Sequence, residues 1–418
     1  MTTIIYSLNE SNESNPNIKE KIYETPQQSY VVLNNNEECN SDSELKTDSL
    51  ENYHSVILEY PSRRLLSFAP PKNQEYTDIN DYLSFYKKNT DIESDFYTNE
   101  FVEGTFIHLF YDPRISSWEI ATKRAVGGNY SYFHIPGKES ITYKQMVIEA
   151  FRENDMSLND LPFLDYLPKN HCYSFVLQHP ANHIVIPIHT PKMYLVSVYK
   201  IDMDKNTATF ISPLEYQLWS AFDNLREGIL YFPKMIDSSS SSFNDYITLI
   251  QNNVSIHTPY TQMGLMMTNL NTGKRCSIIN PNYEEMCKIR GNYTNIQYQY
   301  LCLRRINKVL HFLKYFPQYK SLFYEYREQY ENLLTNIHTS YISYYIQKNG
   351  TFISKKYFSI IYDIHHSIFL PSVKTSLQSG ITEKIIIKRS VIKDYLNQLD
   401  PGKILHIINS ELLATKGF

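Results

Sequence analysis

The chain has 418 residues and a formal charge of −4, and its five cysteines form no C-x-x-C pair. These values exclude a zinc ribbon, a redox motif and a surface that is basic throughout, while 42% hydrophobic residues are enough for a packed core. No apolar run approaches the ~20 residues that a membrane helix needs, and the N-terminus has no signal-peptide pattern. We therefore expect a soluble, intracellular, cytoplasmic protein of two or three domains, with no membrane partner.

Residues 1–48 are expected to form a disordered tail. The stretches SLNESNESNPNIKEK and NNNEECNSDSELKTDS are polar and acidic and contain few aliphatic residues, which is the composition of disordered chains. Between them, YVVL at 30–33 predicts a short strand or a docking segment. The tail is one of two candidate regions for a protein partner, and the C-terminal helices are the other.

Residues 49–295 carry mostly β-strand patterns. FVEGTFIHLFYD and SSWEIATKRAV are separated by the turn dipeptide Asp112-Pro113 and predict a β-hairpin. KMYLVSVYKIDMDKNTATFIS and QMGLMMTNLNTGKRCSII predict two further hairpins, with turns at 204–206 and 271–273. One segment, TYKQMVIEAFREN, has apolar residues at helical spacing.

From residue 296 onward the apolar residues recur with a helical period. The longest such stretch, SLFYEYREQYENLLTNIHTSYISYY, places one set of apolar residues on a single face: Leu322, Phe323, Tyr326, Tyr330, Leu333, Leu334 and Ile337. The expected fold class is therefore α+β. An antiparallel β-rich domain occupies 49–295 and a helical C-terminal domain occupies 296–418.

Five stretches of the β-rich region resemble, in order, the motifs of one enzyme family. RRLLSFAPPK resembles the family's segment before its catalytic motif, and FVEGTFIHLFYD resembles that motif, K-x-D-G, with the following strand. WEIATKRAVGG resembles the next strand with its Thr/Ser-Lys pair, and YSFVLQHPANHIVIP resembles F-E-F and P-x-N-x-I-V. QMGLMMTNLNTGKRCSIINPNY resembles the last two motifs, E-G-hydrophobic-V and K-x-K. Over residues 54–292 the chain thus resembles the nucleotidyltransferase domain of ATP-dependent RNA ligases, most closely the phage tRNA-repair type and ligase-like proteins of large DNA viruses.

The resemblance implies a nucleotidyltransferase-type domain and a reaction in which a lysine amine attacks the α-phosphate of ATP, with magnesium and carboxylates around the triphosphate. At the positions where the family has ionisable catalytic groups, this chain has residues of other types. The nucleophile position is Phe101, the two carboxylate positions are Val176 and Met263, the two final lysine positions are Ser277 and Ile279, and an upstream arginine position is His54.

Other positions keep residues that suit a nucleotide site. The resemblance assigns nucleotide binding to Lys72, Glu103, Gly104 and Lys123, and Asn182 also keeps its place. Because phenylalanine, valine, methionine and isoleucine cannot ionise, coordinate magnesium or clamp phosphate, we interpret the protein as a degenerate ligase-like pseudoenzyme. In this interpretation it retains RNA or nucleotide binding and has no catalytic cofactor.

Two alternatives stay open, so the sequence leaves undecided whether the chain is an enzyme. The protein is an active ATP-dependent RNA ligase if Lys72 or Lys123 serves as a relocated nucleophile, because desolvation in a pocket lowers the pKa of a lysine. ATP and magnesium are then its cofactors. It is a structural or particle-associated viral protein if the fold serves only protein contacts, and its location is then the host cytoplasm or the virion.

The stretch RGNYTNIQYQYLCLRRINK mixes cations with aromatic side chains. Such a mixture can stack bases and hold phosphates, or it can form the seam between two domains. The candidate RNA-binding residues are Lys274, Arg275, Arg290, Arg304, Arg305 and Lys308. The histidine pairs 179/183 and 365/366 lack a third ligand at convincing spacing, so we predict structural roles for them and no metal site.

Overall fold

The computed structural model describes residues 3–8, 17–35, 51–88, 96–131, 140–151, 157–225, 228–236, 243–291, 293, 295–348, 354–378 and 386–415. The chain divides into a β-rich unit that ends at Arg290 and a helical unit that begins at Gly291. The division lies five residues before the boundary expected from the sequence. The α+β fold class is confirmed, because antiparallel sheets make up the first unit and helices make up the second.

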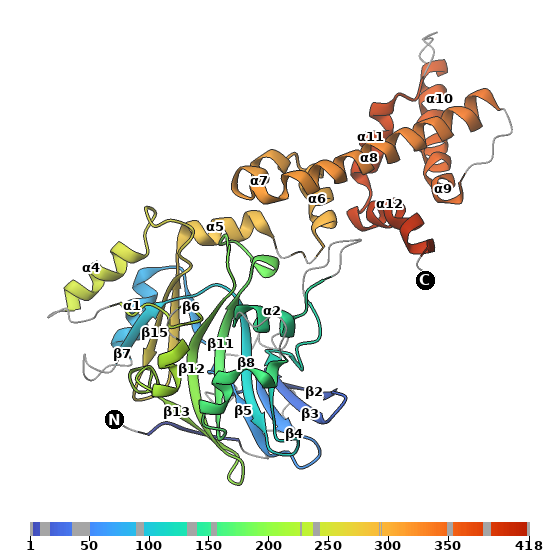
Figure 1. The fold of residues 1–418 in the computed structure, drawn as a ribbon. Coiled ribbons are helices and arrows are strands. Elements are labelled where there is room, and N and C mark those ends of the chain that lie inside the picture. The colour runs from blue at the N-terminus through green and yellow to red at the C-terminus, as the bar shows by residue number, and fades with distance from the viewer. Residues whose placement is uncertain are drawn as a thin grey trace. The chain divides into compact units, whose positions relative to one another are not determined.

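The largest sheet of the β-rich unit has eight strands (Figure 1). Its path is β1 (Ile5–Ser7), β13 (Thr207–Ile211), β12 (Lys192–Asp202), β11 (His171–Gln178), β8 (Thr105–Asp112), β9 (Ser117–Thr122) and β10 (Ala125–Val126), and β14 (Leu230–Tyr231) pairs in parallel with β12. The predicted hairpins β8–β9 and β12–β13 are both present. Alternation along these strands sends neighbouring side chains to opposite faces of the sheet.

Two four-stranded sheets complete the unit. One has the order β2 (Ile18–Glu24), β3 (Ser29–Asn35), β4 (Val56–Glu59) and β5 (Leu65–Phe68). The other has the order β6 (Gln74–Tyr76), β16 (Arg275–Ile279), β15 (Gly264–Asn269) and β7 (Phe96–Glu100). The predicted hairpin at 263–279 is β15–β16, and β6 pairs with β16 in parallel.

The expectation of a disordered N-terminal tail is wrong for residues 18–24 and 29–35. Tyr30 to Leu33 are buried and pair with β4 on one side and β2 on the other. Their side chains join a core with Phe110 and Tyr199 of the large sheet. Burial of this short apolar run outweighs the polar composition of its flanks, while residues 9–16 and 36–50 lie outside the described residues.

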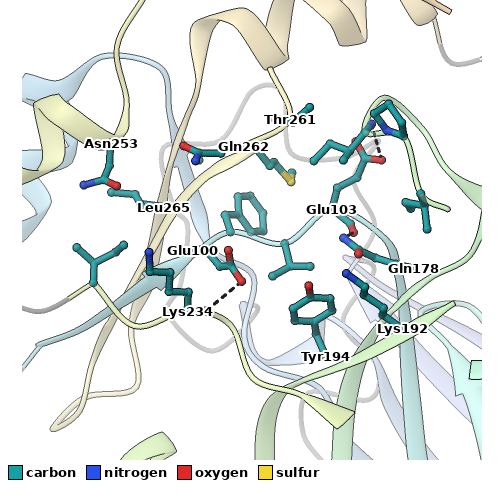
Figure 2. Close-up of a pocket in the computed structure, with 18 of the residues that line it drawn as sticks. Glu100, Glu103, Gln178, Lys192, Tyr194, Lys234, Asn253, Thr261, Gln262 and Leu265 are labelled. Atoms are coloured by element: carbon teal, nitrogen blue, oxygen red, sulfur yellow. Dashed lines mark hydrogen bonds between the residues drawn. The ribbon is translucent and has the colours of Figure 1, made fainter. Parts of the chain in front are cut away.

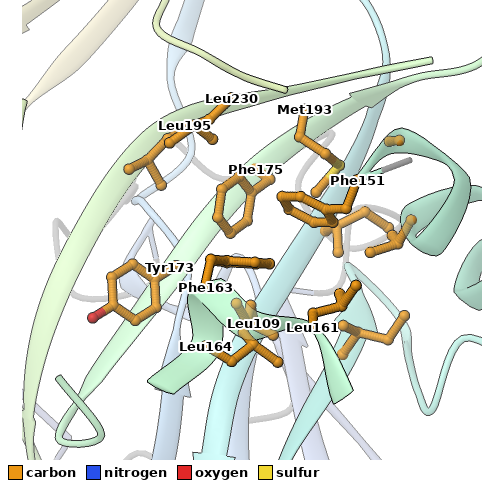
Figure 3. Close-up of a cluster of buried hydrophobic side chains, with 14 of the residues drawn as sticks. Leu109, Phe151, Leu161, Phe163, Leu164, Tyr173, Phe175, Met193, Leu195 and Leu230 are labelled. Carbon is orange, nitrogen blue, oxygen red and sulfur yellow. The ribbon is translucent and has the colours of Figure 1, made fainter. Parts of the chain in front are cut away.

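Apolar cores cover both faces of the large sheet. On one face, Leu109 and Phe175 pack with α2 (Tyr143–Ala150) and with residues 158–167 (Figure 3). The helical pattern predicted at 142–154 is confirmed by α2, which begins with a capping box between Thr142 and Gln145. The opposite face carries the N-terminal sheet.

Helices cover the outer face of the sheet that contains β15. Cys276 and Ile278 of β16 point into this core, which α1 (Ile79–Lys88) and α4 (Phe243–Asn253) close. Alternation then turns Arg275, Ser277 and Ile279 to the inner face. The remaining helices of the β-rich unit are α3 (Pro213–Tyr216) and α5 (Pro281–Arg290), with 3-10 helices at Glu51–Tyr53, Leu158–Asp160, Pro162–Tyr166, Pro180–Asn182 and Ser220–Leu225.

The helical unit is built around its longest helix. The predicted face of α8 (Lys320–Tyr341) is buried except for Leu322, which is half-buried. The other elements are α6 (Ile296–Arg305), α7 (Val309–Tyr315), α9 (Lys355–Ile364), α10 (Leu370–Gln378), α11 (Arg389–Gln398), α12 (Pro401–Thr415), a 3-10 helix at Pro317–Tyr319 and π-helices at Ile342–Gln347 and His365–Phe369. Of the helices in the described residues, none combines the length and apolarity that crossing a bilayer requires.

One buried histidine bridges the large sheet and the N-terminal sheet. The His108 ring lies 3.1 Å from Ser67 Oγ through Nδ1 and 3.0 Å from Ser55 Oγ through Nε2. Burial lowers the pKa of His108 to about 3, and His54 adds a smaller repulsion. The ring is therefore neutral at pH 7 in the folded protein.

This bridge predicts a loss of stability in acid. The unfolded chain takes up a proton at His108 near pH 6.5, whereas the folded chain does so only near pH 3. The free energy of unfolding should therefore fall below pH 6.5, by up to about 1.4 kcal/mol per pH unit from this residue. We expect His108→Gln to flatten urea unfolding free energies measured between pH 7 and 4. Equal slopes for wild type and variant would contradict the assignment.

Candidate functional site

A cavity of about 290 Å³ lies between the large sheet and the sheet that contains β15. Phe106 and Val176, which are opposite each other on β8 and β11, line one wall. Asn99 and Met266, opposite each other on β7 and β15, line the other wall. The cavity therefore lies between the inner faces of two sheets, within the β-rich unit.

Most of the site residues predicted from the sequence meet at this cavity, although they are distant along the chain. Its lining includes His54, Phe101, Glu103, Gly104, Lys123, Val176, Met263 and Arg275, together with Tyr283. Other predicted residues lie elsewhere. Lys72 is exposed outside the lining, and Ser277 is buried, where its Oγ accepts a 2.7 Å hydrogen bond from Asn73. Ile279 is half-buried at the end of β16.

One end of the cavity is lined by Phe101, Val176 and Met263, the apolar residues for which the sequence resemblance predicts catalytic positions. Phe101 donates its backbone N–H to the carbonyl of Gly264 at 2.9 Å, which holds the residue after β7 beside Met263. Val176 lies on β11 against the same segment, since it would touch any side chain added at Gly104. Phe101, Val176 and Met263 offer no nucleophile, no metal ligand and no phosphate contact.

Gly104 is required by the close approach of two strands. A Cβ atom at this position would lie 2.5 Å from the carbonyl oxygen of Leu177 and 2.6 Å from Val176 Cγ1. The absence of a side chain lets the start of β8 pack directly on β11. Gly104 thus shapes the cavity wall without contributing a functional group.

The carboxylate of Glu103 holds a loop. It is 2% exposed and accepts backbone N–H groups from Ile184, Val185 and Ile186 at 3.1–3.2 Å. Burial, and then the charge of Glu103, raise the pKa of Tyr283, which is hydrogen bonded to the same carboxylate. These partners occupy both oxygens, so Glu103 anchors residues 184–186 to the cavity wall.

The cavity also has a cationic region. The Nδ1–H of His54 donates a 3.3 Å hydrogen bond to the carbonyl oxygen of Pro70. Burial, and then the charges of Lys123, Arg275 and Lys72, lower the pKa of His54 to about 4. His54 is therefore neutral at pH 7, beside cations. Burial also lowers the pKa of Arg275, which is close to the hydroxyls of Tyr199, Tyr6 and Tyr216.

A second cavity of about 350 Å³ lies on the other side of the 101–103 segment (Figure 2). Glu100, Lys192, Tyr194 and Lys234 line it, and Glu100 accepts the backbone N–H of Lys234 at 3.0 Å. Phe101, Glu103 and Met263 line this cavity as well, so residues of the family-like motifs border both cavities. The sequence does not predict the second cavity, because its polar residues Lys192, Tyr194 and Lys234 belong to none of those motifs.

The candidate RNA-binding residues do not form one basic surface. Lys274, Arg305 and Lys308 are exposed. Contrary to a surface role, Arg290 is 1% exposed, because the helical period places it on the buried face of α5 with Tyr283 and Met286.

Arg304 is occupied within the helical unit. Its Nη1 donates a 2.8 Å hydrogen bond to Asn397, and its guanidinium carbon lies 3.4 Å from the ring centre of Tyr330. This arginine stabilises the packing of α6 against α8 and α11. Of the predicted cations in the helical unit, Arg305 and Lys308 are left exposed.

No group of three or more histidine, cysteine, aspartate or glutamate side chains in the described part of the chain is arranged to hold a metal ion. His179 instead hydrogen bonds Glu149 at 2.9 Å and accepts the N–H of Ala181 at 3.1 Å. It therefore caps a turn. His365 is stacked on Tyr345 with ring centres 3.7 Å apart.

Comparison with known proteins gives distant relatives. No protein-family model matches the chain. The chain is 21% identical over 374 residues to an immediate-early protein ICP-46 homolog of Invertebrate iridescent virus 6, an alignment that covers 87% of this chain and 78% of that protein. It is 28% identical over 110 residues to an RNA ligase of Rhodothermus phage RM378, covering 25% of this chain and 23% of that protein.

Among solved structures, a Naegleria gruberi RNA ligase with ATP and Mn aligns at 15% identity with a TM-score of 0.36. The alignment covers 53% of this chain and 59% of that ligase, less than two thirds of its length. The predicted resemblance to RNA ligases and to viral proteins is confirmed by the sequence similarities.

The hydrogen bonds from the amides of residues 184–186 to the Glu103 carboxylate, called the Glu103 clamp below, should contribute to the free energy of unfolding. Glu103→Gln keeps the shape of the side chain but removes the charge and one acceptor, so it should destabilise the fold by about 1–3 kcal/mol. Urea unfolding measures this loss, and hydrogen exchange should become faster at the amides of residues 184–186.

Glu100→Gln is the matched control, because Glu100 also lines both cavities but accepts a single backbone N–H. It should cost less than about 1 kcal/mol. Unchanged exchange at residues 184–186 in the Glu103 variant would contradict the clamp.

Proposed function

We propose that the protein is a catalytically degenerate RNA ligase-like protein, which binds a nucleotide in the cavity between its sheets without becoming adenylylated. The observation that supports this proposal is the apolar end of the cavity, where Phe101, Val176 and Met263 stand together. Adenylylation needs an amine for attack on the α-phosphate and carboxylates for the metal ion. None of these three side chains supplies either group.

The replacements are consistent with a cavity maintained for binding. A phenylalanine and a methionine at a former reaction centre remove charges that would otherwise be desolvated, which stabilises the domain. Lys123 and Arg275 meanwhile keep positive charge in the lining, and phosphate groups bind to such side chains. The similarity to the phage RNA ligase supports the ligase origin of the fold.

The active-ligase alternative depends on Lys123. This lysine lines the cavity, whereas Lys72 is exposed outside the lining. A relocated nucleophile would therefore be Lys123, with ATP and magnesium as cofactors. Metal binding would still require carboxylates, and those of the lining are Glu75, Glu100 and Glu103.

We predict that purified protein forms no covalent AMP adduct. The measurement is incubation with α-labelled ATP and magnesium or manganese, followed by denaturing electrophoresis, with an active RNA ligase run in parallel. An adduct that survives denaturation would overturn the proposal. Loss of that adduct in Lys123→Ala, but not in Lys72→Ala, would identify the relocated nucleophile.

Exposed cations support RNA binding by the helical unit. Arg305 is the last residue of α6 and Lys308 is the N-cap residue of α7, and both side chains are exposed. If they contact phosphates, affinity for single-stranded RNA should fall with rising salt.

We predict that Ala substitution at Arg305 and Lys308 weakens RNA binding and lowers the steepness of its salt dependence by about one unit per phosphate contact. Fluorescence anisotropy at several salt concentrations measures both quantities. Arg304→Ala is an unsuitable control because it breaks the packing on Tyr330, so Lys314→Ala on α7 is used. Absence of both RNA and nucleotide binding would favour the third hypothesis, a structural or particle-associated viral protein.

A further inference from the structure

Arg275 is an unusual cation within the cavity. It is the first residue of β16 and lies opposite Thr268 of β15, and its side chain lines the cavity. Its charge also interacts with the buried tyrosines Tyr6 of β1, Tyr199 of β12 and Tyr216 of α3, which lie outside the cavity lining.

The charge of Arg275 is not balanced within the described part of the protein. No described carboxylate lies within ion-pair distance of its guanidinium group. Of the three carboxylates of the lining, Glu103 accepts three amides and Glu100 accepts the N–H of Lys234. Glu75 is exposed on β6, opposite Ser277, and forms no ion pair with Arg275. Desolvating an arginine without a counter-ion is costly, so an anion in the cavity would stabilise it.

The tyrosine cluster behind Arg275 also supplies no counter-charge. Among the described residues, the buried hydroxyl of Tyr6 has no hydrogen-bond partner. Burial raises the pKa of Tyr6 to about 12, so the hydroxyl keeps its proton at neutral pH and can donate it. The hydroxyl packs against Gly273, two residues before Arg275, and lies outside the cavity lining.

Arg275 lies at the end of the cavity opposite Phe101, the position for which the resemblance predicts the ligase nucleophile. Arg275 is opposite Thr268, which is opposite Tyr97, and Tyr97 precedes Phe101 by four residues. At about 3.3 Å per residue, the two ends are about 13 Å apart along the strands. The cavity therefore has an apolar end at Phe101 and a cationic end at Arg275.

We propose that Arg275, with Lys123 and His54 nearby, forms a site for the phosphate of a nucleotide, held without a metal ion at the end of the cavity opposite Phe101. This inference rests on the proposed nucleotide binding and adds where the phosphate lies. The guanidinium group can donate two parallel hydrogen bonds to phosphate oxygens, and Lys123 contributes a second positive charge. A phosphate in this position lies out of reach of the former reaction centre.

The test is isothermal titration calorimetry of the full chain in EDTA with AMP, adenosine and inorganic pyrophosphate. Wild type should bind AMP at least about tenfold more tightly than adenosine, and Arg275→Met should remove that difference. Lys274→Met is the matched control, since it removes the neighbouring positive charge from an exposed side chain outside the cavity, and it should leave AMP affinity unchanged. Pyrophosphate binding that depends on Arg275, in the absence of AMP binding, would identify a free phosphate ligand instead.

Thermal unfolding without ligand shows whether the Arg275→Met variant is folded. Arg275→Met should melt at the same temperature as wild type or higher, because an unbalanced buried charge has been removed. A lower melting temperature with unchanged AMP affinity would show that Arg275 is structural and would overturn the inference. Equal binding of AMP and adenosine to wild type would also overturn it while leaving nucleotide binding intact. Binding of neither would refute the proposed nucleotide binding itself.

Discussion

The hydrogen bonds between Glu103 and the amides of residues 184–186 fix the geometry on which both cavities depend. Glu103 follows β7 and precedes β8, so the clamp ties the crossing between two sheets to the loop after β11. Gly104 lets that crossing lie directly on Leu177. The positions of Phe101 and Val102, which line both cavities, follow from these two constraints.

With the frame held in this way, the chemistry inside it can change while the fold persists. Under the proposed function, an apolar side chain at position 101 or 263 replaces a charge that the cavity would desolvate, and the fold is more stable without that charge. Arg275 differs from these residues, because it is a half-buried cation that forms no ion pair with any described carboxylate. A cavity under selection for stability alone would not retain such a cation.

The sequence predicts structural features that depend on residues close together in the chain. It does not predict features that depend on contacts between residues far apart in the chain. The face of α8, the cap of α2 and the turns of three hairpins follow from local spacing and turn residues. That Phe101, Val176 and Met263 line one cavity follows from the sequence only through the resemblance to ligases. The sequence predicts RNA contacts for Arg275 and Arg290, but strand alternation does not say which face is enclosed, and Arg275 lines the cavity. Arg290 is buried on α5, a position that only the tertiary packing determines.

The strands at 18–35 also bear on how the protein can be shortened. A chain cut at residue 49, as its composition invites, would lose β1 to β3 together with Tyr6. The backbone of β4 would then have an open edge where β3 had paired, and Phe110 and Tyr199 would lose their cover. Open edges beside uncovered aromatic surface promote pairing between molecules. The shortened protein would self-associate, and its poor behaviour would be mistaken for a property of the intact fold.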